Sequence, residues 1–229
     1  MRKFVLMTTA MAVLATPVAA ADLLIIDEPI AYTDAGFDWN GFYAGLSGGY
    51  GGGTVRSLGT GTGVTTDVPA NGALLGVTLG ANAQYDAFVL GVEGEVLWSG
   101  LSGSTTCVGA PAFSCNANIE WLGSVRGRAG YAMDNVLLFA TAGVAAGGGR
   151  GTITPTFPGT TSVFSETYVG WTAGAGVEVA VTDAITVKAE YSYYNLGSRM
   201  APIGTLGTIQ SFTVSPIVHA VKVGVNMHF

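Results

Sequence analysis

The segment FVLGVEGEVLW, residues 88–98, decides the fold. Its two aromatic ends, Phe88 and Trp98, fall on one parity with the apolar residues between them, whereas Glu93 and Glu95 fall on the other. Successive side chains of a strand point to opposite faces, so this pattern predicts a β-strand with one apolar and one polar face.

Seven other segments share this two-residue period, which makes eight predicted strands in all. They cover approximately residues 40–51, 72–84, 88–99, 118–131, 136–147, 167–180, 184–195 and 216–229. A tilted strand needs roughly 9–11 residues to cross a bilayer, and each segment is at least that long. In the fifth strand, apolar residues from Leu137 to Val144 fall on both parities, so its orientation stays open.

The connections between these strands alternate between short and long. The short ones, at 85–87, 132–135 and 182–183, each contain an Asp suited to a tight turn. The long ones, near 52–71, 100–117, 148–166 and 196–215, are rich in Gly, Thr, Ser and Pro. Short periplasmic turns and long extracellular loops are typical of outer-membrane barrels, so we expect both chain termini on the periplasmic side.

The composition excludes several classes of protein. Of 229 residues, 49% are apolar, only 10% are charged and 35 are Gly, whereas a water-soluble domain carries roughly 25% charged residues. A mean hydropathy of +0.46 excludes a disordered chain. A net charge of −6 with no basic cluster excludes a nucleic-acid partner, because binding requires positive charge against the phosphates.

The N-terminal region predicts an exported protein. Residues 1–21 combine two basic residues, an apolar stretch and a small-residue end, the pattern of a secretory signal peptide. Residues 22–38 form an acidic segment that we expect in the periplasm, and residues 39–229 form the barrel. After residue 21 no apolar run approaches the length of a transmembrane helix, so a closed sheet is the remaining way to span a bilayer.

A water-soluble barrel with its apolar face inward would show the same alternation. Its outer surface would then consist mainly of Gly and Ala, which makes a poor water-facing surface. Aromatic residues also favour the membrane, since they fall near both strand ends, as expected for two interfacial girdles. The predicted girdles contain Phe42, Tyr85, Phe88, Tyr131 and Phe229 near the short turns and Tyr50, Trp98, Trp121, Trp171 and Tyr193 near the long loops.

Six short stretches of the chain resemble a known family. They are WNGFYAG (39–45), GVEGE (91–95), VRGRAGY (125–131), AGAGVE (173–178), AEYSYY (189–194) and VGVNMHF (223–229). Together they are similar to the small outer-membrane β-barrels of Gram-negative bacteria, a family that includes surface antigens and is often labelled porin-like. The resemblance implies an eight-stranded antiparallel up-and-down transmembrane barrel, and it implies that Phe229 contributes to recognition by the barrel-assembly machinery.

Charged residues occupy the inward parity of five of the predicted strands. They are Glu93, Glu95, Arg126, Arg128, Glu178, Lys188, Glu190 and Lys222, four acids and four bases. A basic side chain turned to lipid near the midplane costs about 2–4 kcal/mol, so this belt fixes the register. Two interpretations follow: a self-satisfied polar core, because eight strands leave room only for side chains, or a gated narrow passage, for which inward glycines such as Gly45 and Gly80 would leave space.

Few residues indicate any other chemistry. Cys107 and Cys115, in the second long loop of an exported chain, predict a disulfide rather than a metal site. His219 and His228 have no catalytic partner that the sequence fixes, and His228, near the periplasmic rim, is expected to be a solvated or interfacial residue. We therefore expect no enzymatic activity, no cofactor and no metal.

The functional expectation is an integral outer-membrane barrel that acts mainly as a structural and surface-exposed component. Its expected partners are outer-membrane lipids, lipopolysaccharide and an extracellular ligand at the loops. The alternative is a narrow porin-like channel for small solutes.

Overall fold

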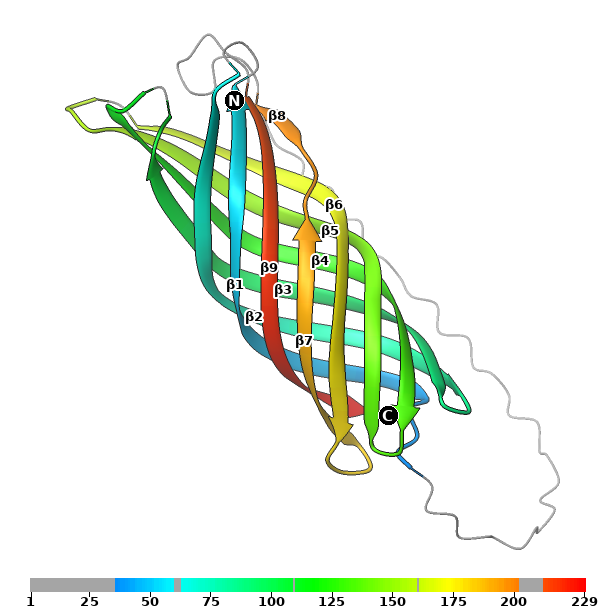
Figure 1. Ribbon diagram of the computed structural model, residues 1–229. Coiled ribbons are helices and arrows are strands. Elements are labelled where there is room, and N and C mark those ends of the chain that lie inside the picture. The colour runs from blue at the N-terminus through cyan, green and yellow to red at the C-terminus, as the bar shows by residue number, and fades with distance from the viewer. Residues whose placement is uncertain (1–35, 60–62, 109, 160, 202–211) are drawn as a thin grey trace, which may run out of the picture. The chain divides into compact units, whose positions relative to one another are not determined.

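The computed structural model describes residues 36–59, 63–108, 110–159, 161–201 and 212–229 (Figure 1). The predicted signal peptide, and residues 22–35 of the predicted acidic segment, lie outside the described residues. No helix in the described ranges is long and apolar enough to cross a membrane. These ranges contain nine strands: β1 (Gly41–Gly59), β2 (Thr65–Tyr85), β3 (Phe88–Thr106), β4 (Phe113–Met133), β5 (Val136–Pro155), β6 (Ser162–Ala180), β7 (Ile185–Asn195), β8 (Arg199–Ala201) and β9 (Phe212–His228).

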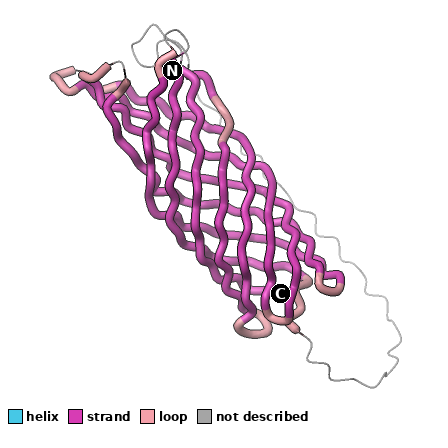
Figure 2. The backbone as a smooth tube through the Cα atoms, viewed as in Figure 1, coloured by secondary structure: helices cyan, strands magenta, loops and turns pink. Residues whose placement is uncertain are grey.

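The strands form one closed antiparallel sheet, as the tube in Figure 2 shows. Each of the strands β1 to β7 pairs with the next, except that β7 pairs with β9, which closes the sheet against β1. The short strand β8 also pairs with β9, so β7 and β8 act as one strand interrupted at residues 196–198. The prediction of an eight-stranded antiparallel up-and-down barrel is confirmed.

The predicted strand ends on the long-loop side are wrong. Strands β1 to β6 continue through most of the segments 52–71, 100–117 and 148–166, which the sequence presented as loops. The register of β1 against β2, for example, runs without a break from Gly41↔Asn82 to Leu58↔Thr65. Beyond the bilayer neither strand face needs to be apolar, so these extensions lack the alternation that reveals a strand. Thr-rich and Ser-rich segments can still pair there through their backbones.

The short connections are tight turns, as expected. Asp86 and Asp134 have φ angles of 53° and 51°, the left-handed backbone that Asp tolerates better than most residues. In the third turn, the Thr182 hydroxyl accepts hydrogen bonds from the backbone N–H groups of Ala184 and Ile185, at 3.3 and 3.0 Å. Each of these turns therefore has a local chemical reason to reverse the chain.

The outer surface of the barrel is apolar along the middle of the strands. Side chains such as Leu46, Leu79 and Val125 are 64–68% exposed. Strand β5, whose orientation the sequence left open, turns Leu138 and Val144 outward and buries Leu137 inside. The ambiguity arose because inward and outward positions of β5 are both apolar.

The interior is less polar than the sequence pattern suggested. Along β3, the inward residues run from Val89, near the short turns, through Glu93 and Glu95 to Leu97 and Leu101. The charged layer therefore lies between two apolar layers. The smaller one contains Trp39, Val89, Leu137 and Phe139. The larger one, on the long-loop side, contains Leu74, Leu97, Leu101, Ile119, Leu122, Ala145, Tyr168, Tyr194, Leu196, Val214, Val218 and Ala220.

A disulfide joins Cys107 to Cys115 at the outer end of the β3–β4 hairpin, as predicted. The Cα atoms are 5.3 Å apart, and Cys107 N–H donates to the Phe113 carbonyl at 3.0 Å. The bond therefore closes a turn that the backbone already holds.

We expect replacement of both cysteines by Ser to lower the free energy of unfolding by about 2–3 kcal/mol. The reason is that the bond removes chain entropy from the unfolded state, and the closed ring is short. Urea titration of the barrel in lipid vesicles would measure the change, with reduced wild type as the matched comparison. Alkylation followed by mass measurement under non-reducing conditions should find no free thiol, and two alkylated cysteines would contradict the assignment.

Candidate functional site

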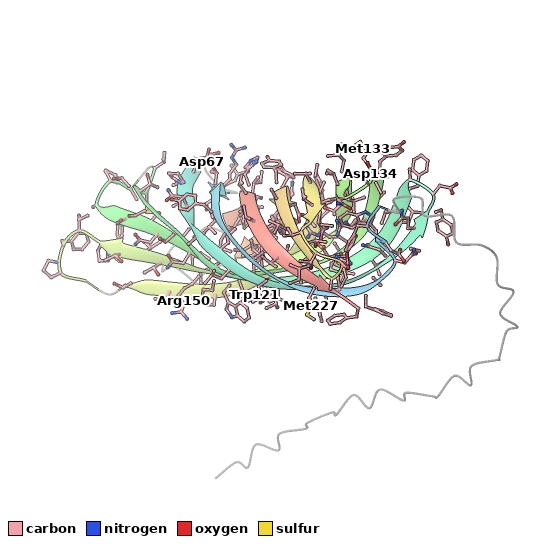
Figure 3. The ribbon with its side chains drawn as sticks, turned by 90° about the horizontal axis from the view of Figure 1, so that it is seen from below. Asp67, Trp121, Met133, Asp134, Arg150 and Met227 are labelled. Atoms are coloured by element: carbon pink, nitrogen blue, oxygen red, sulfur yellow. A yellow bond between two sulfur atoms is a disulfide. The ribbon has the colours of Figure 1, made fainter. Side chains whose placement is uncertain are left out.

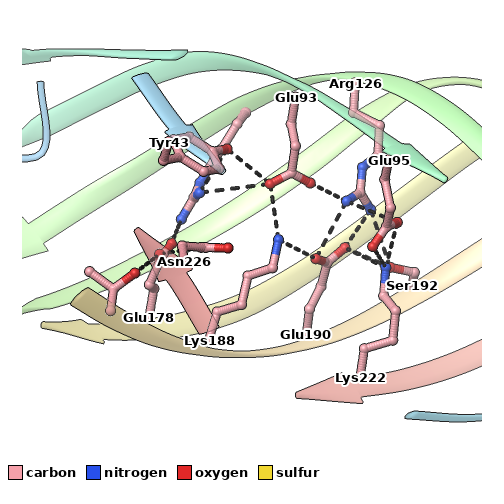
Figure 4. A network of polar contacts seen from close by, with 12 residues as sticks. Tyr43, Glu93, Glu95, Arg126, Glu178, Lys188, Glu190, Ser192, Lys222 and Asn226 are labelled. Carbon is pink, nitrogen blue, oxygen red and sulfur yellow. Dashed lines mark hydrogen bonds and ion pairs between the residues drawn. The ribbon is translucent and has the colours of Figure 1, made fainter. Parts of the chain in front are cut away.

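All eight charged residues of the predicted belt lie inside the barrel, and Figure 4 labels all of them except Arg128. Each is at most 3% exposed, although β3, β4, β6, β7 and β9 supply them from different sides. The alternation places them there, because each residue shares the inward parity of its strand. The belt combines four carboxylates with four cations, so its formal charge is zero.

Arg126 and the carboxylates around it form the centre of the belt. Its guanidinium donates to Glu93 and to Glu190, and it lies 3.3 Å from a Glu95 oxygen. The Glu93 contact follows directly from the register, since the two residues are cross-strand partners. Charge-assisted hydrogen bonds of this kind are stronger than neutral ones.

The other three cations each have a main acidic partner. Lys188 Nζ lies 3.0 Å from Glu93, and Lys222 Nζ lies 2.6 Å from Glu95. Arg128 donates to Glu178, which belongs to β6 and therefore reaches it across the barrel interior. Both lysines also approach Glu190, at 3.8 and 3.7 Å. A buried charge is costly unless it is paired, and here every charge has an opposite partner.

Neutral polar side chains occupy further positions around the carboxylates. Tyr43 donates to Glu93 at 2.9 Å, Tyr194 to Glu95 at 3.0 Å, and Asn226 to Glu178 at 2.6 Å. Ser192 donates to Glu190 at 2.6 Å, and Thr186 donates to Glu178. These five residues were not predicted from the sequence, because they carry no charge. Four of them share the inward parity of a strand that carries belt charges, which was the available signal, whereas Tyr43 lies on β1, which carries none.

The inward glycines do not leave open space, contrary to the expectation attached to a passage. A side chain at Gly80 would overlap the ring of Tyr43, and one at Gly76 would overlap Leu97. A side chain at Gly45 would likewise overlap the amide of Asn226. These glycines therefore accept neighbouring side chains and allow the interior to fill.

Aromatic residues cover the belt at the short-turn end of the barrel. Trp39 is fully buried, and Tyr43 stacks on the ring of His228 with 5.3 Å between centroids. Phe37 lies 5.2 Å from the same imidazole, so the last residues of the predicted acidic segment pack at this end. His228 is only 8% exposed, which corrects its expected place at a solvated rim. It lies on the inward parity, next to the outward Phe229.

The contacts of His228 do not form a nucleophile–base–acid relay. The Thr186 hydroxyl at 3.3 Å and the Glu178 carboxylate at 3.6 Å both approach the same atom, Nε2. A catalytic histidine needs the nucleophile on one ring nitrogen and the orienting acid on the other. In the described part of the chain, no group of three or more His, Cys, Asp or Glu side chains is placed to hold a metal ion.

The predicted girdle residues lie on the outer surface. Nine of them are 37–72% exposed, and Tyr193 is half-buried, with its ring 5.2 Å from both Trp171 and His219. His219 also points outward, where Nδ1 lies 2.7 Å from the Tyr191 hydroxyl. Figure 3 shows outward side chains at Trp121 and Met227, and it places Asp134 far from Asp67 and Arg150 along the barrel.

The outer extensions of the strands carry their charges on the surface. Arg56 and Asp67 form a bidentate pair with contacts of 2.9 and 3.2 Å, and Arg150 lies 3.5 Å from Glu120. The hydrogen bonds from Arg56 hold the pKa of Asp67 below its ordinary value. Both pairs are at least 44% exposed, so they contribute little to stability.

This chain is similar to several known outer-membrane proteins. A family model described as "Outer membrane protein beta-barrel domain" matches residues 8–229. The 31 kDa outer-membrane immunogenic protein of Brucella melitensis is 33% identical over 251 aligned positions, covering 99% of this chain and 100% of the relative. The 22 kDa outer membrane protein of Rhizobium leguminosarum bv. viciae is 34% identical, covering 83% and 78%. The crystal structure of OprG from Pseudomonas aeruginosa gives a TM-score of 0.49 at 13% identity, covering 86% and 99%.

Proposed function

The chain belongs to the outer-membrane β-barrel family, and from this premise we propose that it is a closed, structural and surface-exposed component of the bacterial outer membrane. The observation that carries the proposal is the filled interior. A layer of buried charges, each with a partner of opposite charge, lies between two apolar clusters.

A filled interior opposes conduction for two physical reasons. The larger apolar layer contains Leu97 and Leu122, at 1% and 0% exposure, and a hydrated ion would lose its water there without any compensating ligand. In the charged layer, opening a path means separating ion pairs such as Lys222–Glu95, whose atoms lie 2.6 Å apart. Neighbouring side chains occupy the space beside inward glycines such as Gly45 and Gly80, so these glycines do not support a passage.

The outer extensions of the strands support a role at the cell surface. They reach well beyond the outer aromatic residues, for example from Tyr50 to Gly59 on β1. The Brucella and Rhizobium relatives are both called outer-membrane proteins, and the Brucella protein is called immunogenic. Surface exposure of the long-loop end, with the short turns in the periplasm, is consistent with both observations.

We also propose which molecules contact the barrel. The apolar outer surface contacts outer-membrane lipid and lipopolysaccharide, the assembly machinery handles the chain through its terminal Phe229, and the loops meet an extracellular ligand. The protein acts without a catalytic step, which agrees with the single-nitrogen contacts of His228.

Conductance of the purified protein in planar bilayers tests the proposal. We expect no discrete conductance steps in wild type, and none in Glu93→Ala, because the apolar layer above Glu93 stays in place. A folded fraction measured by heat-dependent gel mobility, and a wide porin recorded in the same bilayers, serve as controls. Reproducible steps in wild type, altered in size by Glu93→Ala, would show that the belt lines a passage.

A further inference from the structure

The outer end of the barrel encloses a cavity of about 500 Å³. Six of the strands, the turn after β3 and Leu196 after β7 contribute to its wall, so it lies within the mouth of the barrel. Its floor is the top of the larger apolar layer, because Ile119, Leu196 and Val214 belong to both. Cavities of about 300–1,000 Å³ are typical of small-molecule sites.

The lining of this outer cavity is mostly apolar. It includes Val55, Val68, Phe113, Ile119, Phe164 and Val214. Arg150 is the charged residue among the described lining residues, and its guanidinium already lies beside Glu120 on the surface. A charged ligand would lose its hydration without gaining a counter-charge, so the lining favours a neutral molecule.

Tyr168 supplies a polar group that lacks a protein partner. It lines the cavity and is 5% exposed, yet its hydroxyl makes no hydrogen bond to any residue that the structure describes. The hydroxyl oxygen is not among the fully buried polar atoms that lack a partner, so it can be reached from the cavity. A ligand with one donor or acceptor can form a hydrogen bond with it there.

An interruption of the barrel wall borders the same cavity. The pairing of β6 with β7 ends at Trp171↔Asn195, and in the described residues the outer half of β6 pairs with β5 alone. Gly197, with φ of 70°, still lies against Val169 of β6 just after this pairing ends. Tyr168 of β6 stands on one side of the interruption, and β8, which pairs with Val214 of β9, stands on the other. It begins beyond the outer girdle residue Trp171, on the long-loop side of the membrane interface.

We propose that the outer cavity binds a small, neutral, largely apolar molecule that exchanges one hydrogen bond with the Tyr168 hydroxyl. The site is independent of whether the barrel conducts, since the apolar layer below it separates it from the charge belt. The proposal therefore stands or falls separately from that of a closed barrel.

Methyl-selective NMR of the protein in lipid nanodiscs tests this site with 2-naphthol, which is neutral and carries one hydroxyl. The methyl signals of Ile119 and Val214 should shift and reach saturation. Those of Val92 and Val223, which face outward at 62% and 57% exposure, report partition of the probe into lipid. Absence of saturable shifts at Ile119 and Val214 overturns the proposal, as do parallel, unsaturated shifts at all four residues.

Three variants sharpen the assignment. Tyr168→Phe should weaken the binding of 2-naphthol about fivefold, which is the usual contribution of one hydrogen bond, and leave the binding of naphthalene unchanged. Ala117→Phe, from a buried lining position, should fill the cavity and abolish binding of both probes. The matched control Val169→Phe, on the outward parity of β6, should bind like wild type. Heat-dependent gel mobility verifies that each variant folds. If Ala117→Phe does not fold, Val68→Phe takes its place as the variant that fills the cavity. Wild-type affinity for the probes in a folded cavity-filling variant overturns the proposed site.

Discussion

Replacement of Arg126 by Ala is expected to lower the free energy of unfolding by about 3–5 kcal/mol, the range for breaking a buried ion pair. Arg126 is 1% exposed and contacts Glu93, Glu95 and Glu190. Without it, four buried carboxylates face three cations. Urea titration of the barrel in lipid vesicles would measure the loss. Arg56→Ala, at an exposed pair, is the matched control and should unfold like wild type.

A second substitution separates charge imbalance from lost packing. Removing Glu190 together with Arg126 leaves three complete pairs: Glu93 with Lys188, Glu95 with Lys222, and Glu178 with Arg128. The double variant Arg126→Met, Glu190→Gln should therefore recover at least half of the stability that Arg126→Met alone loses. Equal losses in the single and double variants would mean that the belt acts through shape rather than charge.

The exterior of the barrel could be predicted from the sequence because one physical rule governs it. Every outward residue between the girdles faces lipid, so apolar residues recur with period two on strands such as 88–98. The same rule fixes the inward position of Glu93 and Arg126. It does not depend on which strands are neighbours, and a single sequence therefore reveals it.

The outer third of the strands could not be predicted for the complementary reason. Residues 52–59 and 65–71 pair with each other along β1 and β2, but both of their faces are free of the lipid constraint. Gly, Thr and Ser in this region read as a loop. The cavity at this end was equally hidden, since its lining comes from segments as distant as Val55 and Val214.

The interior was predicted in part. Glu93 and Arg126 lie on neighbouring strands, so their contact can be inferred from the strand order. Arg128 and Glu178 lie on strands that are not neighbours, and they come into contact only across the interior of the closed barrel. The apolar layers were missed because Leu97 and Leu122 share the parity of the charges, and a rule that sorts only polar from apolar faces treats them as exceptions. Leu97 and Leu122 lie beyond Glu95 and Arg126 on the long-loop side, so the interior changes from charged to apolar along the barrel axis.

The lipid-facing assignment predicts a large effect at Val92. Val92 is 62% exposed on the outer surface and lies between the girdle residues Phe88 and Trp98 of the same strand. Val92→Arg should lower the free energy of unfolding in lipid vesicles by about 2–4 kcal/mol, because a guanidinium near the bilayer midplane loses its hydration. Urea titration in vesicles measures the loss.

The same substitution beyond the outer girdle isolates the contribution of the lipid. Val163 is outward and 56% exposed, but it lies eight residues beyond Trp171 on β6, where the strand has left the bilayer. Val163→Arg should unfold like wild type, since its guanidinium stays in water. Both variants keep the paired belt intact, so the difference between them measures depth in the membrane alone. Equal stability of Val92→Arg and Val163→Arg would contradict the placement of this surface in lipid.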